Sequence, residues 1–252
     1  MDQHIKTLQE LFADDAVSYD DVRFGSISGQ LYCEAHYLTL KKMLLSNFTS
    51  EISTGKKPIR ILDVAMGTGR SSIRMASEGI EVVGIDVTIE MMQVARKKKT
   101  SEIPLSFVQG DAFKLPFKTN SFDAIICCRM LQMIPLENYS IFGVEISRIL
   151  RSNGVFIAEL WNKSYQSIRC LGQKSRNTWG LNDTFITIQQ RRTLFGNKLV
   201  AKDIAGLGFP LVLPILGRIS KKWTLKLYLK LTQNTFTKNW GESFFAQYRL
   251  LE

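Results

Sequence analysis

The segment from Ile59 to Arg70 constrains the fold more than any other part of the chain. Its apolar residues are typical of a strand that is buried on both faces of a parallel sheet. The strand is expected to end in the turn Gly67-Thr68-Gly69, and a helix is expected to begin near Arg70. A strand, a glycine turn and a helix in this order hold a nucleotide-like ligand at the carboxyl end of a sheet. Glycine lets the backbone approach such a ligand, and the first N–H groups of the helix are free to bind an anion, here a carboxylate.

Aspartates stand near the ends of the first two predicted strands. Asp86 lies 19 positions after Gly67, close to the spacing of roughly 20 at which a strand-end acid binds ribose hydroxyls. The alternative for Asp86 is an N-cap of the helix that begins near Ile89. Thr88 already offers a cap there, so ribose binding is favoured. Asp63 could accept a hydrogen bond from an ammonium group or from the N–H groups of the turn.

The chain after the glycine turn alternates between strand-like and helix-like segments. This alternation predicts an α/β fold, with a parallel sheet that is covered by helices. The predicted strands lie near residues 59–65, 81–86, 105–109, 123–128 and 154–160, and the predicted helices near 69–79, 89–99 and 138–151.

The chain before the first strand is predicted to contain two helices. Residues 1–12 place Ile5, Leu8 and Leu11-Phe12 on one face, and residues 31–45 resume the same spacing. The polar segment from Phe12 to Gly29 is expected to be rich in turns.

Further segments extend the pattern, and they complete a resemblance. They are Phe107–Ala112 with Leu115–Phe117, Ser121–Cys128, Glu145–Gly154 and, near the N-terminus, Tyr19–Phe24. Together with the glycine turn and Asp86, this ordered set resembles the class I S-adenosylmethionine-dependent methyltransferases, in the type 11 and quinone-biosynthesis-like group. The resemblance covers about residues 15–160.

The chain departs from the family pattern at a few positions. Ala65 stands where the family usually has glycine, and it narrows the approach to a ligand by one methyl group. Gln132 stands where many relatives carry histidine, so no base is expected there. Asn153-Gly154 replaces the usual Pro-Gly and still suits a tight turn.

The resemblance implies a Rossmann-like, seven-stranded, mostly parallel sheet with helices on both faces, an antiparallel last strand and a helical N-terminal lid. Residues 1–50 would form the lid. Residues 51–252 would form the methyltransferase domain, with substrate-side insertions near 162–195 and 217–241.

The C-terminal part is expected to complete the sheet. A helix is predicted over Gly196–Gly208, a strand over Leu211–Leu216 and a closing strand over Ser243–Leu251. Apolar residues alternate strictly over residues 223–231, which is a strand-like period. The family more often places a helix here, and a helix is favoured.

The resemblance also implies S-adenosylmethionine as the cofactor. Arg23 would bind its carboxylate, since a guanidinium can hold a carboxylate with two hydrogen bonds; the alternative is a surface ion pair with Asp20 or Asp21. Asp111 and the N–H of Ala112 would bind adenine. The complete set of predicted cofactor-binding residues is Tyr19, Arg23, Asp63, Ala65, Met66, Gly67, Gly69, Asp86, Val87, Met91, Gly110, Asp111, Ala112, Phe113, Cys128 and Arg129.

His36 is the candidate catalytic residue, because it lies in the predicted lid helix and could reach the methyl group. More often such a histidine is simply half-exposed. The cysteines have no metal-binding or redox spacing, so no metal is expected and the thiols are interpreted as reduced in a cytoplasmic protein. The chain shows no signal peptide and no apolar run of the ~20 residues that span a bilayer.

The net charge of +10 is concentrated in the C-terminal part, where residues 162–252 hold 15 Lys or Arg and 4 Asp or Glu. A solvated basic face, an acidic substrate, a membrane surface and a nucleic acid are all compatible with this excess. The favoured function is methyl transfer to a small-molecule acceptor that is amphipathic or acidic. The basic, leucine-rich segment Lys221–Lys230 suits such a substrate or a peripheral membrane contact.

Two other functions remain as alternatives. An RNA methyltransferase is supported only by the C-terminal charge. An NAD(P)-dependent oxidoreductase is disfavoured because Ser72 stands at the position of the third glycine. A DNA partner is not expected, and the sequence predicts no particular oligomeric state.

Overall fold

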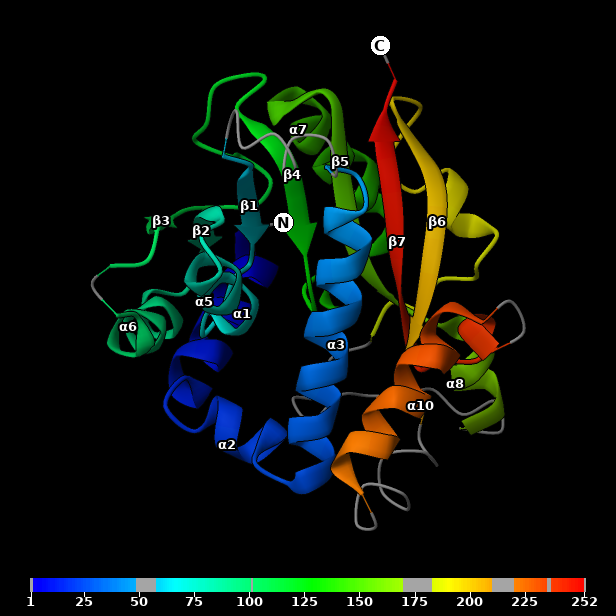
Figure 1. Cartoon of the computed structure of the whole chain (residues 1–252). Helices are drawn as coiled ribbons and strands as arrows, with labels where there is room; N and C mark the ends of the chain where they lie inside the picture. The colour runs from blue at the N-terminus through cyan, green and yellow to red at the C-terminus, as the bar shows by residue number, and fades with distance from the viewer. Residues whose placement is uncertain are drawn as a thin grey trace.

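One seven-stranded sheet, in the order β3-β2-β1-β4-β5-β7-β6, forms the centre of the described structure (Figure 1). The computed structural model describes residues 2–48, 58–100, 102–169, 183–209, 220–234 and 237–251. The strands are β1 (Arg60–Val64), β2 (Glu81–Asp86), β3 (Leu105–Gln109), β4 (Phe122–Cys127), β5 (Leu150–Trp161), β6 (Leu199–Leu207) and β7 (Ser243–Leu250). Neighbours from β3 to β5 are parallel, whereas β7 is antiparallel to both β5 and β6. The predicted Rossmann-like sheet with an antiparallel last strand is therefore confirmed.

The strand order reverses between β1 and β4. From β1 the chain moves outward to β2 and β3, then returns to the other side of β1 to form β4 and β5. Helices α5 (Arg70–Ser77), α6 (Ile89–Lys98) and α7 (Tyr139–Ile149) confirm the three predicted between these strands. In open parallel sheets, ligands bind at the carboxyl ends of the strands at such a reversal.

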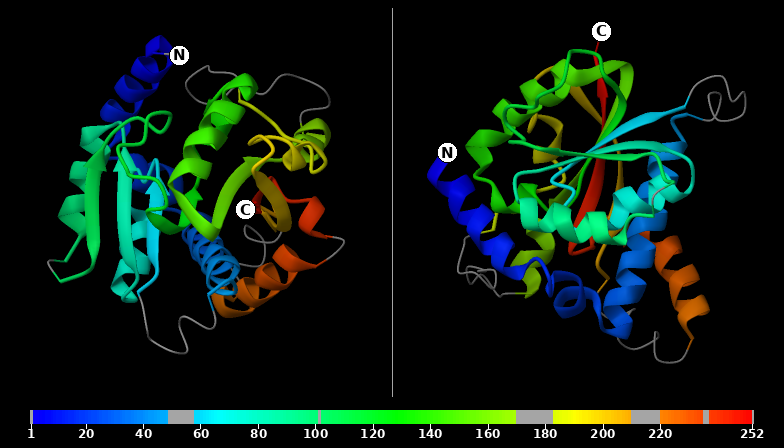
Figure 2. Two further views of the ribbon diagram at one scale, coloured as in Figure 1. Left: turned by 90° about the horizontal axis from the view of Figure 1, so that it is seen from above. Right: turned by 90° about the vertical axis from the view of Figure 1, so that its left-hand side faces the viewer.

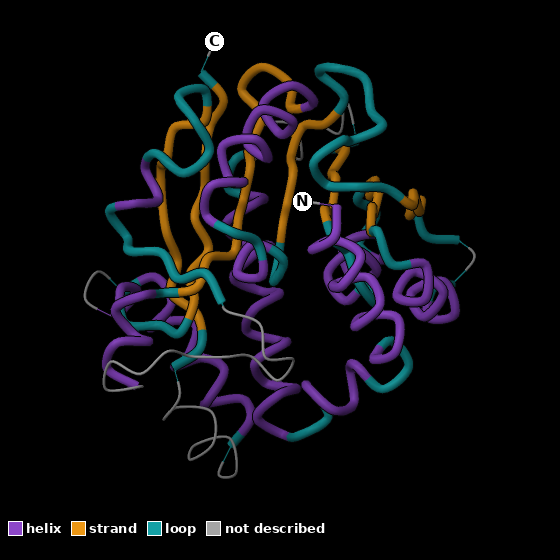
Figure 3. The backbone as a smooth tube through the Cα atoms, turned by 180° about the vertical axis from the view of Figure 1, so that it is seen from behind, coloured by secondary structure: helices purple, strands orange, loops and turns teal. Residues whose placement is uncertain are grey.

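Alternate residues of the central strands serve two separate cores. In β4, Ala124 and Ile126 pack in a cluster with residues of α3 (Ile27–Leu45) and α5. Ile125 and Cys127 pack in a second cluster, which contains residues of α7. The two helix layers are visible as α3 in front of the sheet in Figure 1 and α7 in front of it in Figure 3, which is seen from behind. Both faces of the sheet are thus covered, which explains why the central strands are apolar throughout.

The N-terminal part is more helical than predicted. Helix α1 (Asp2–Asp15) is followed by α2 (Tyr19–Phe24), which lies inside the segment that was expected to be rich in turns. Helix α3 begins at Ile27 because the side chain of Ser26 accepts a hydrogen bond from the N–H of Gly29 (3.0 Å), which is an N-cap. Figure 2 shows α1 passing α6, and the Gln9 side chain donates to the carbonyl oxygen of Val87 (3.2 Å).

The C-terminal part contains one wrong prediction. Residues 199–207 form strand β6 and not a helix, because they pair with β7 along its free side. Such pairing overrides helix propensity, which is a weak signal in a short segment with alanine and leucine. The strand predicted over Leu211–Leu216 lies outside the described residues. The closing strand is confirmed as β7.

Residues 221–233 form helix α10, as favoured, despite the alternating apolar pattern. Thr224, Tyr228 and Thr232 are its buried residues, and their spacing of four positions is helical. The side chain of Ser220 caps the helix by accepting from the N–H of Trp223 (3.4 Å).

The remaining elements are short: α8 (Lys163–Arg169) and the 3₁₀ turns η1 (Leu131–Met133), η2 (Leu136–Asn138), η3 (Gln190–Arg192) and η4 (Thr237–Asn239). Across the described ranges, no helix has the length and apolar character that crossing a membrane requires.

Candidate functional site

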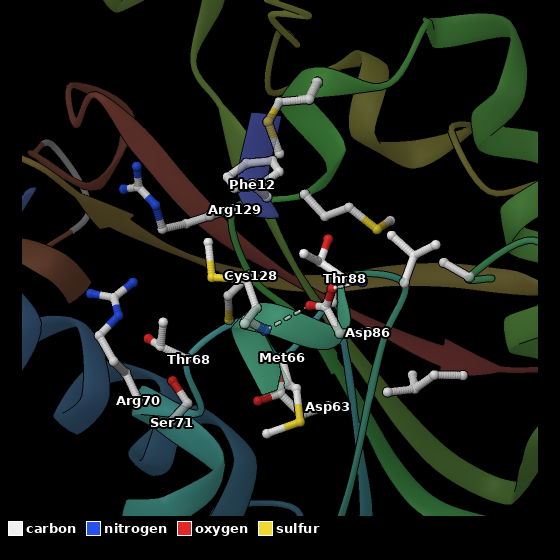
Figure 4. A pocket seen from close by; sticks show the side chains of 18 of the residues that line it. Phe12, Asp63, Met66, Thr68, Arg70, Ser71, Asp86, Thr88, Cys128 and Arg129 are labelled. Atoms are coloured by element: carbon white, nitrogen blue, oxygen red, sulfur yellow. Dashed lines mark hydrogen bonds between the residues drawn. The ribbon is translucent and has the colours of Figure 1, made fainter. Parts of the chain in front are cut away.

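A cavity of about 320 Å³ lies at the carboxyl ends of β1, β2 and β4, where the strand order reverses. Side chains of α1 and α3 complete its wall. Figure 4 shows Arg70 and Arg129 at one end of the cavity and Asp86 with Thr88 at the other. Of the predicted cofactor-binding residues, those that line the cavity are Tyr19, Asp63, Ala65, Met66, Gly67, Asp86, Val87, Met91, Gly110, Asp111, Ala112, Phe113, Cys128 and Arg129.

The glycine turn after β1 presents bare backbone to the cavity. Gly67 has φ of +54°, and no atom lies within 4 Å of the position that a Cβ would occupy. Ala65 also has a positive φ, of 56°. This left-handed conformation costs an alanine roughly 1–3 kcal/mol, and such strain clusters at functional sites.

Gly69, which was predicted to bind the cofactor, does not line the cavity. A Cβ on Gly69 would lie 3.0 Å from Ile73 Cδ1 and 3.1 Å from the Cβ of Ala95. This glycine therefore allows α5 to pack closely against α6.

Asp86 links the ends of β1 and β2. Its Oδ2 accepts from the N–H of Gly67 (2.8 Å), and its Oδ1 accepts from the N–H of Thr88 (2.9 Å). Burial raises the pKa of Asp86, although these hydrogen bonds oppose the rise. Each carboxylate oxygen keeps a second lone pair, so Asp86 can still accept from ligand hydroxyls.

Asp63 is more deeply enclosed, with 3% of its surface exposed. The hydroxyl of Ser72 donates to its Oδ2 (2.5 Å). Burial raises the pKa of Asp63 to about 7; the Ser72 hydrogen bond opposes the rise and the nearby charge of Asp86 adds to it. Asp63 thus carries a negative charge only part of the time near neutral pH.

Two arginines make the opposite end of the cavity cationic. The guanidinium of Arg70 lies 3.6 Å from the centre of the Phe24 ring and 3.5 Å from Asp20 Oδ1. Arg129 lies two positions after the buried end of β4, and it has φ of 61°. Its Nε is buried and has no hydrogen-bond partner among the described residues. Burial would lower the pKa of Arg129, but Tyr19 and other facing groups raise it, so Arg129 stays cationic.

Arg23, which was predicted to bind the cofactor carboxylate, is absent from the cavity wall. Its Nη2 pairs with Asp15 Oδ2 (3.2 Å), and its guanidinium lies 4.9 Å from the centre of the Tyr19 ring. The expected alternative, a pair with Asp20 or Asp21, is not the pair that forms. Asp20 instead accepts from the hydroxyl of Thr68 (2.9 Å), which joins α2 to the glycine turn.

The loop after β3 forms a third part of the wall. The N–H of Phe113 donates to Asp111 Oδ1 (2.9 Å), so Asp111 partly stabilises its own turn. The apolar surface nearby includes side chains that the sequence motifs did not indicate: Ile5, Leu8, Phe12, Met133 and Ile134. The first three of these belong to the apolar face predicted for the first helix. The sequence therefore indicated this apolar face, but not that it lines the cavity.

His36 also lines the cavity, from the middle of α3, and it is 7% exposed. Its Nε2 lies 3.1 Å from Oε2 of Glu159, a fully buried carboxylate near the end of β5. Ligand atoms of His36, Glu159 and Cys128 all lie within 4.8 Å of one another. The sequence motifs indicated neither Glu159 nor this grouping, because the residues are far apart in the chain.

Comparisons with known proteins give a consistent result. Residues 62–158 match the family model described as Methyltransferase domain. A Bacillus subtilis (strain 168) protein, YqeM, is 34% identical over 139 residues, which are 54% of this chain and 53% of YqeM. A demethylmenaquinone methyltransferase of Renibacterium salmoninarum is 44% identical over 111 residues, which are 44% of this chain and 45% of that protein. The chain thus matches about half the length of these curated relatives.

A solved structure extends the likeness to nearly the whole chain. It is the crystal structure of magnesium protoporphyrin IX methyltransferase from Synechocystis PCC 6803 with bound SAH, with a TM-score of 0.64. The match covers 98% of this chain and 99% of that chain, at 15% identity, and so shows a common fold. None of these comparisons supports the RNA methyltransferase or the oxidoreductase alternative.

Proposed function

We propose, because residues 62–158 match the family model described as Methyltransferase domain, that the chain binds S-adenosylmethionine and transfers its methyl group to a small-molecule acceptor. The observation that carries the proposal is the cavity itself. Three features border the same space: the bare backbone of Gly67, the two acceptor oxygens of Asp86, and the positive charges of Arg70 and Arg129.

The residues present fit the three chemical parts of the cofactor. Asp86 has lone pairs left for the two ribose hydroxyls. Arg70, at the start of α5, suits the carboxylate through its charge and through the free N–H groups of that helix. The loop from Gly110 to Phe113, together with Met91, offers a mostly apolar surface for adenine.

When bound, the cofactor supplies a methyl group that its sulfonium makes electrophilic. The chain's own residues then have to orient the acceptor and exclude water. In well-aligned systems these effects contribute up to ~7–11 kcal/mol.

The acceptor is proposed to be small and largely apolar, with one polar group. Two proteins to which the chain is similar, in sequence and in fold respectively, are a demethylmenaquinone methyltransferase and a magnesium protoporphyrin IX methyltransferase. The side chains of Ile5, Leu8, Phe12, Met133 and Ile134 would contact the apolar part of the acceptor. Residues 1–50 would act as a lid, and the segments near 162–195 and 217–241 would lie on the acceptor side.

Calorimetric titration with S-adenosylhomocysteine, and separately with NAD, tests the cofactor. We expect binding of the first only. Asp86→Ala should weaken it at least ten-fold, or about 1.4 kcal/mol, whereas Asp203→Ala, which changes an exposed aspartate on β6, should leave it unchanged. Binding of NAD instead, or an unaltered affinity in Asp86→Ala, would overturn the assignment. Labelled cofactor added to a cell extract would then reveal the methylated product.

A further inference from the structure

Glu159 is a buried carboxylate with hydrogen-bond partners at both of its oxygens. It has no exposed surface. Oε1 accepts from the hydroxyls of Ser243 (2.9 Å) and Tyr32 (3.3 Å), and Oε2 faces Nε2 of His36 (3.1 Å). Burial alone would raise the pKa of Glu159, but the charge of a protonated His36, the charge of Arg129 and the hydrogen bond from Ser243 lower it to about 2. Arg129 and the hydroxyl donors favour the ionised carboxylate whether or not His36 carries a proton.

An ionised carboxylate at this distance determines which nitrogen of the neutral His36 imidazole carries the proton. It fixes the N–H on Nε2, so that Nδ1 is left as the proton acceptor of the neutral ring. Nδ1 has no hydrogen-bond partner among the described residues, and His36 borders the cavity. The imidazole also packs edge-to-face with the ring of Phe245, and the two ring centres are 4.8 Å apart. Such a pair is the arrangement of a general base and the group that orients it.

Arg129 is the cationic group that would stabilise an oxyanion beside this ring, against the opposing charge of Glu159. Arg129 interacts electrostatically with both Glu159 and Tyr32, so it lies close to the pair. It lines the same cavity, and its buried Nε is unpartnered within the described part of the chain. A buried N–H without a partner is costly, and an anionic oxygen would satisfy it.

We propose that His36 and Glu159 form a proton-accepting pair for an acceptor with an acidic hydroxyl group, of the phenol or enol class, and that Arg129 binds the resulting oxyanion. The inference rests on the proposed function and names the substrate class for it. The O–H bond of the acceptor breaks, the proton bonds to Nδ1 of His36, and the electron pair stays on the oxygen. Glu159 balances the charge of the imidazolium and acts as a positioning residue.

A metal ion bound to His36, Glu159 and Cys128 is the competing interpretation. Arg129 disfavours it, because it places a positive charge near the carboxylate that would have to bind the cation.

The decisive experiment uses 4-nitrophenol, whose ionised form is yellow, with the full chain saturated with S-adenosylhomocysteine. Below the pKa of the free probe, wild-type protein should bind it as the phenolate. His36→Gln and Glu159→Gln should each lower the ratio of bound phenolate to phenol by about ten-fold, or one unit of apparent pKa. Lys41→Gln is the matched control, because it removes an ion pair with Glu78 elsewhere on α3 (2.6 Å).

The outcomes separate this inference from the proposed function. If S-adenosylhomocysteine does not bind to any variant, the proposed function itself fails. If it binds equally to all variants but the probe is not bound, or is equally ionised in wild type and His36→Gln, only the proton-accepting pair is overturned. Since the chain has two histidines, the imidazole signal that disappears in His36→Gln can be followed by NMR. It should move toward the imidazolium position when the probe is added to wild type, and an unmoved signal contradicts the proposal.

Discussion

The two ends of the cavity are built in different ways. The end near Asp86 joins this carboxylate to the backbone N–H of Gly67, 19 positions earlier in the turn after the preceding strand. The end near His36 uses side chains that are 123 positions apart, on α3 and β5. A ligand site made of a backbone turn depends on one local segment, whereas a site made of distant side chains depends on the packing of the whole sheet. Variants at the two ends should therefore separate binding from chemistry.

The largest expected effect is on catalysis at the His36 end. Loss of a general base lowers rates by about 10²–10⁴-fold, so His36→Gln should reduce kcat by an amount in this range. The affinity for S-adenosylhomocysteine should change less than two-fold. Steady-state kinetics with the identified acceptor, together with calorimetry, checks both. A joint loss of rate and cofactor affinity would contradict the separation of the two ends.

A somewhat smaller effect is expected from Gly67→Val. Valine is strained at φ of +54°, and its side chain would project into the open space where the cofactor is proposed to lie. We expect about 100-fold weaker binding of S-adenosylhomocysteine, or roughly 2.7 kcal/mol. Gly79→Val is a control, since Gly79 also has a positive φ and open space around it but lies outside the cavity wall. Equal losses in both variants would show that strain alone is responsible.

The two buried acids should respond to pH in opposite directions. The folded-state pKa of Asp63 is raised from 3.8 to about 7, so the folded state binds more protons and Asp63 lowers stability as pH rises between these values. The folded-state pKa of Glu159 is lowered from 4.5 to about 2, so its stabilising contribution is present above pH 4.5 and is lost as pH falls through this range.

Asp63→Asn tests this difference. It should increase the free energy of unfolding by roughly 2 kcal/mol above pH 7, with little change near pH 4. Urea unfolding at several pH values measures this. A gain that does not depend on pH would contradict the assigned role of the carboxylate.

A moderate effect is expected where the sequence and the structure disagree about the carboxylate-binding arginine. Arg70→Gln should weaken S-adenosylhomocysteine binding about ten-fold, or 1.4 kcal/mol, because Arg70 lines the cavity. Arg23→Gln should have less effect, since Arg23 pairs with Asp15 outside the wall. The reverse ranking would restore the prediction made from the sequence.

The smallest effect is expected for Lys41→Gln, which removes a partly exposed ion pair from α3. Such pairs contribute about 0–1 kcal/mol. Thermal unfolding should show only a small change in stability. A large loss of stability would mean that α3 is sensitive to any substitution, and the effects of His36→Gln would then have to be corrected for lost stability.

The difference between the two ends also explains what could be predicted from the sequence. The turn after β1, the acid at the end of β2 and the loop after β3 are each encoded within a few residues, and their motifs placed them correctly around one cavity. Glu159 carries no such local signal, because only its position beside α3 and β7 makes it significant. The N-terminal motif pointed to Arg23, whereas Arg70 is the arginine that lines the cavity, because a motif indicates a residue type and not which side chain faces inward.

The same limit applies to the fold. Strands β1 to β5 follow from apolar runs with turn residues between them, whereas β6 depends on its partner β7, about forty positions later in the chain. A helical pattern such as that of residues 196–208 cannot compete once that partner is in place.

The position of β7 has a consequence for how the chain is assembled. Although β7 is synthesised after the other six strands of the sheet, it lies in the interior of the sheet, between β5 and β6. Until Ser243–Leu250 has left the ribosome, β5 presents an unpaired edge and β6 has no neighbour, and such edges promote aggregation. The same strand supplies the hydroxyl of Ser243 to Glu159, so a nascent chain that stops short of it lacks both the closed sheet and the support for its buried carboxylate.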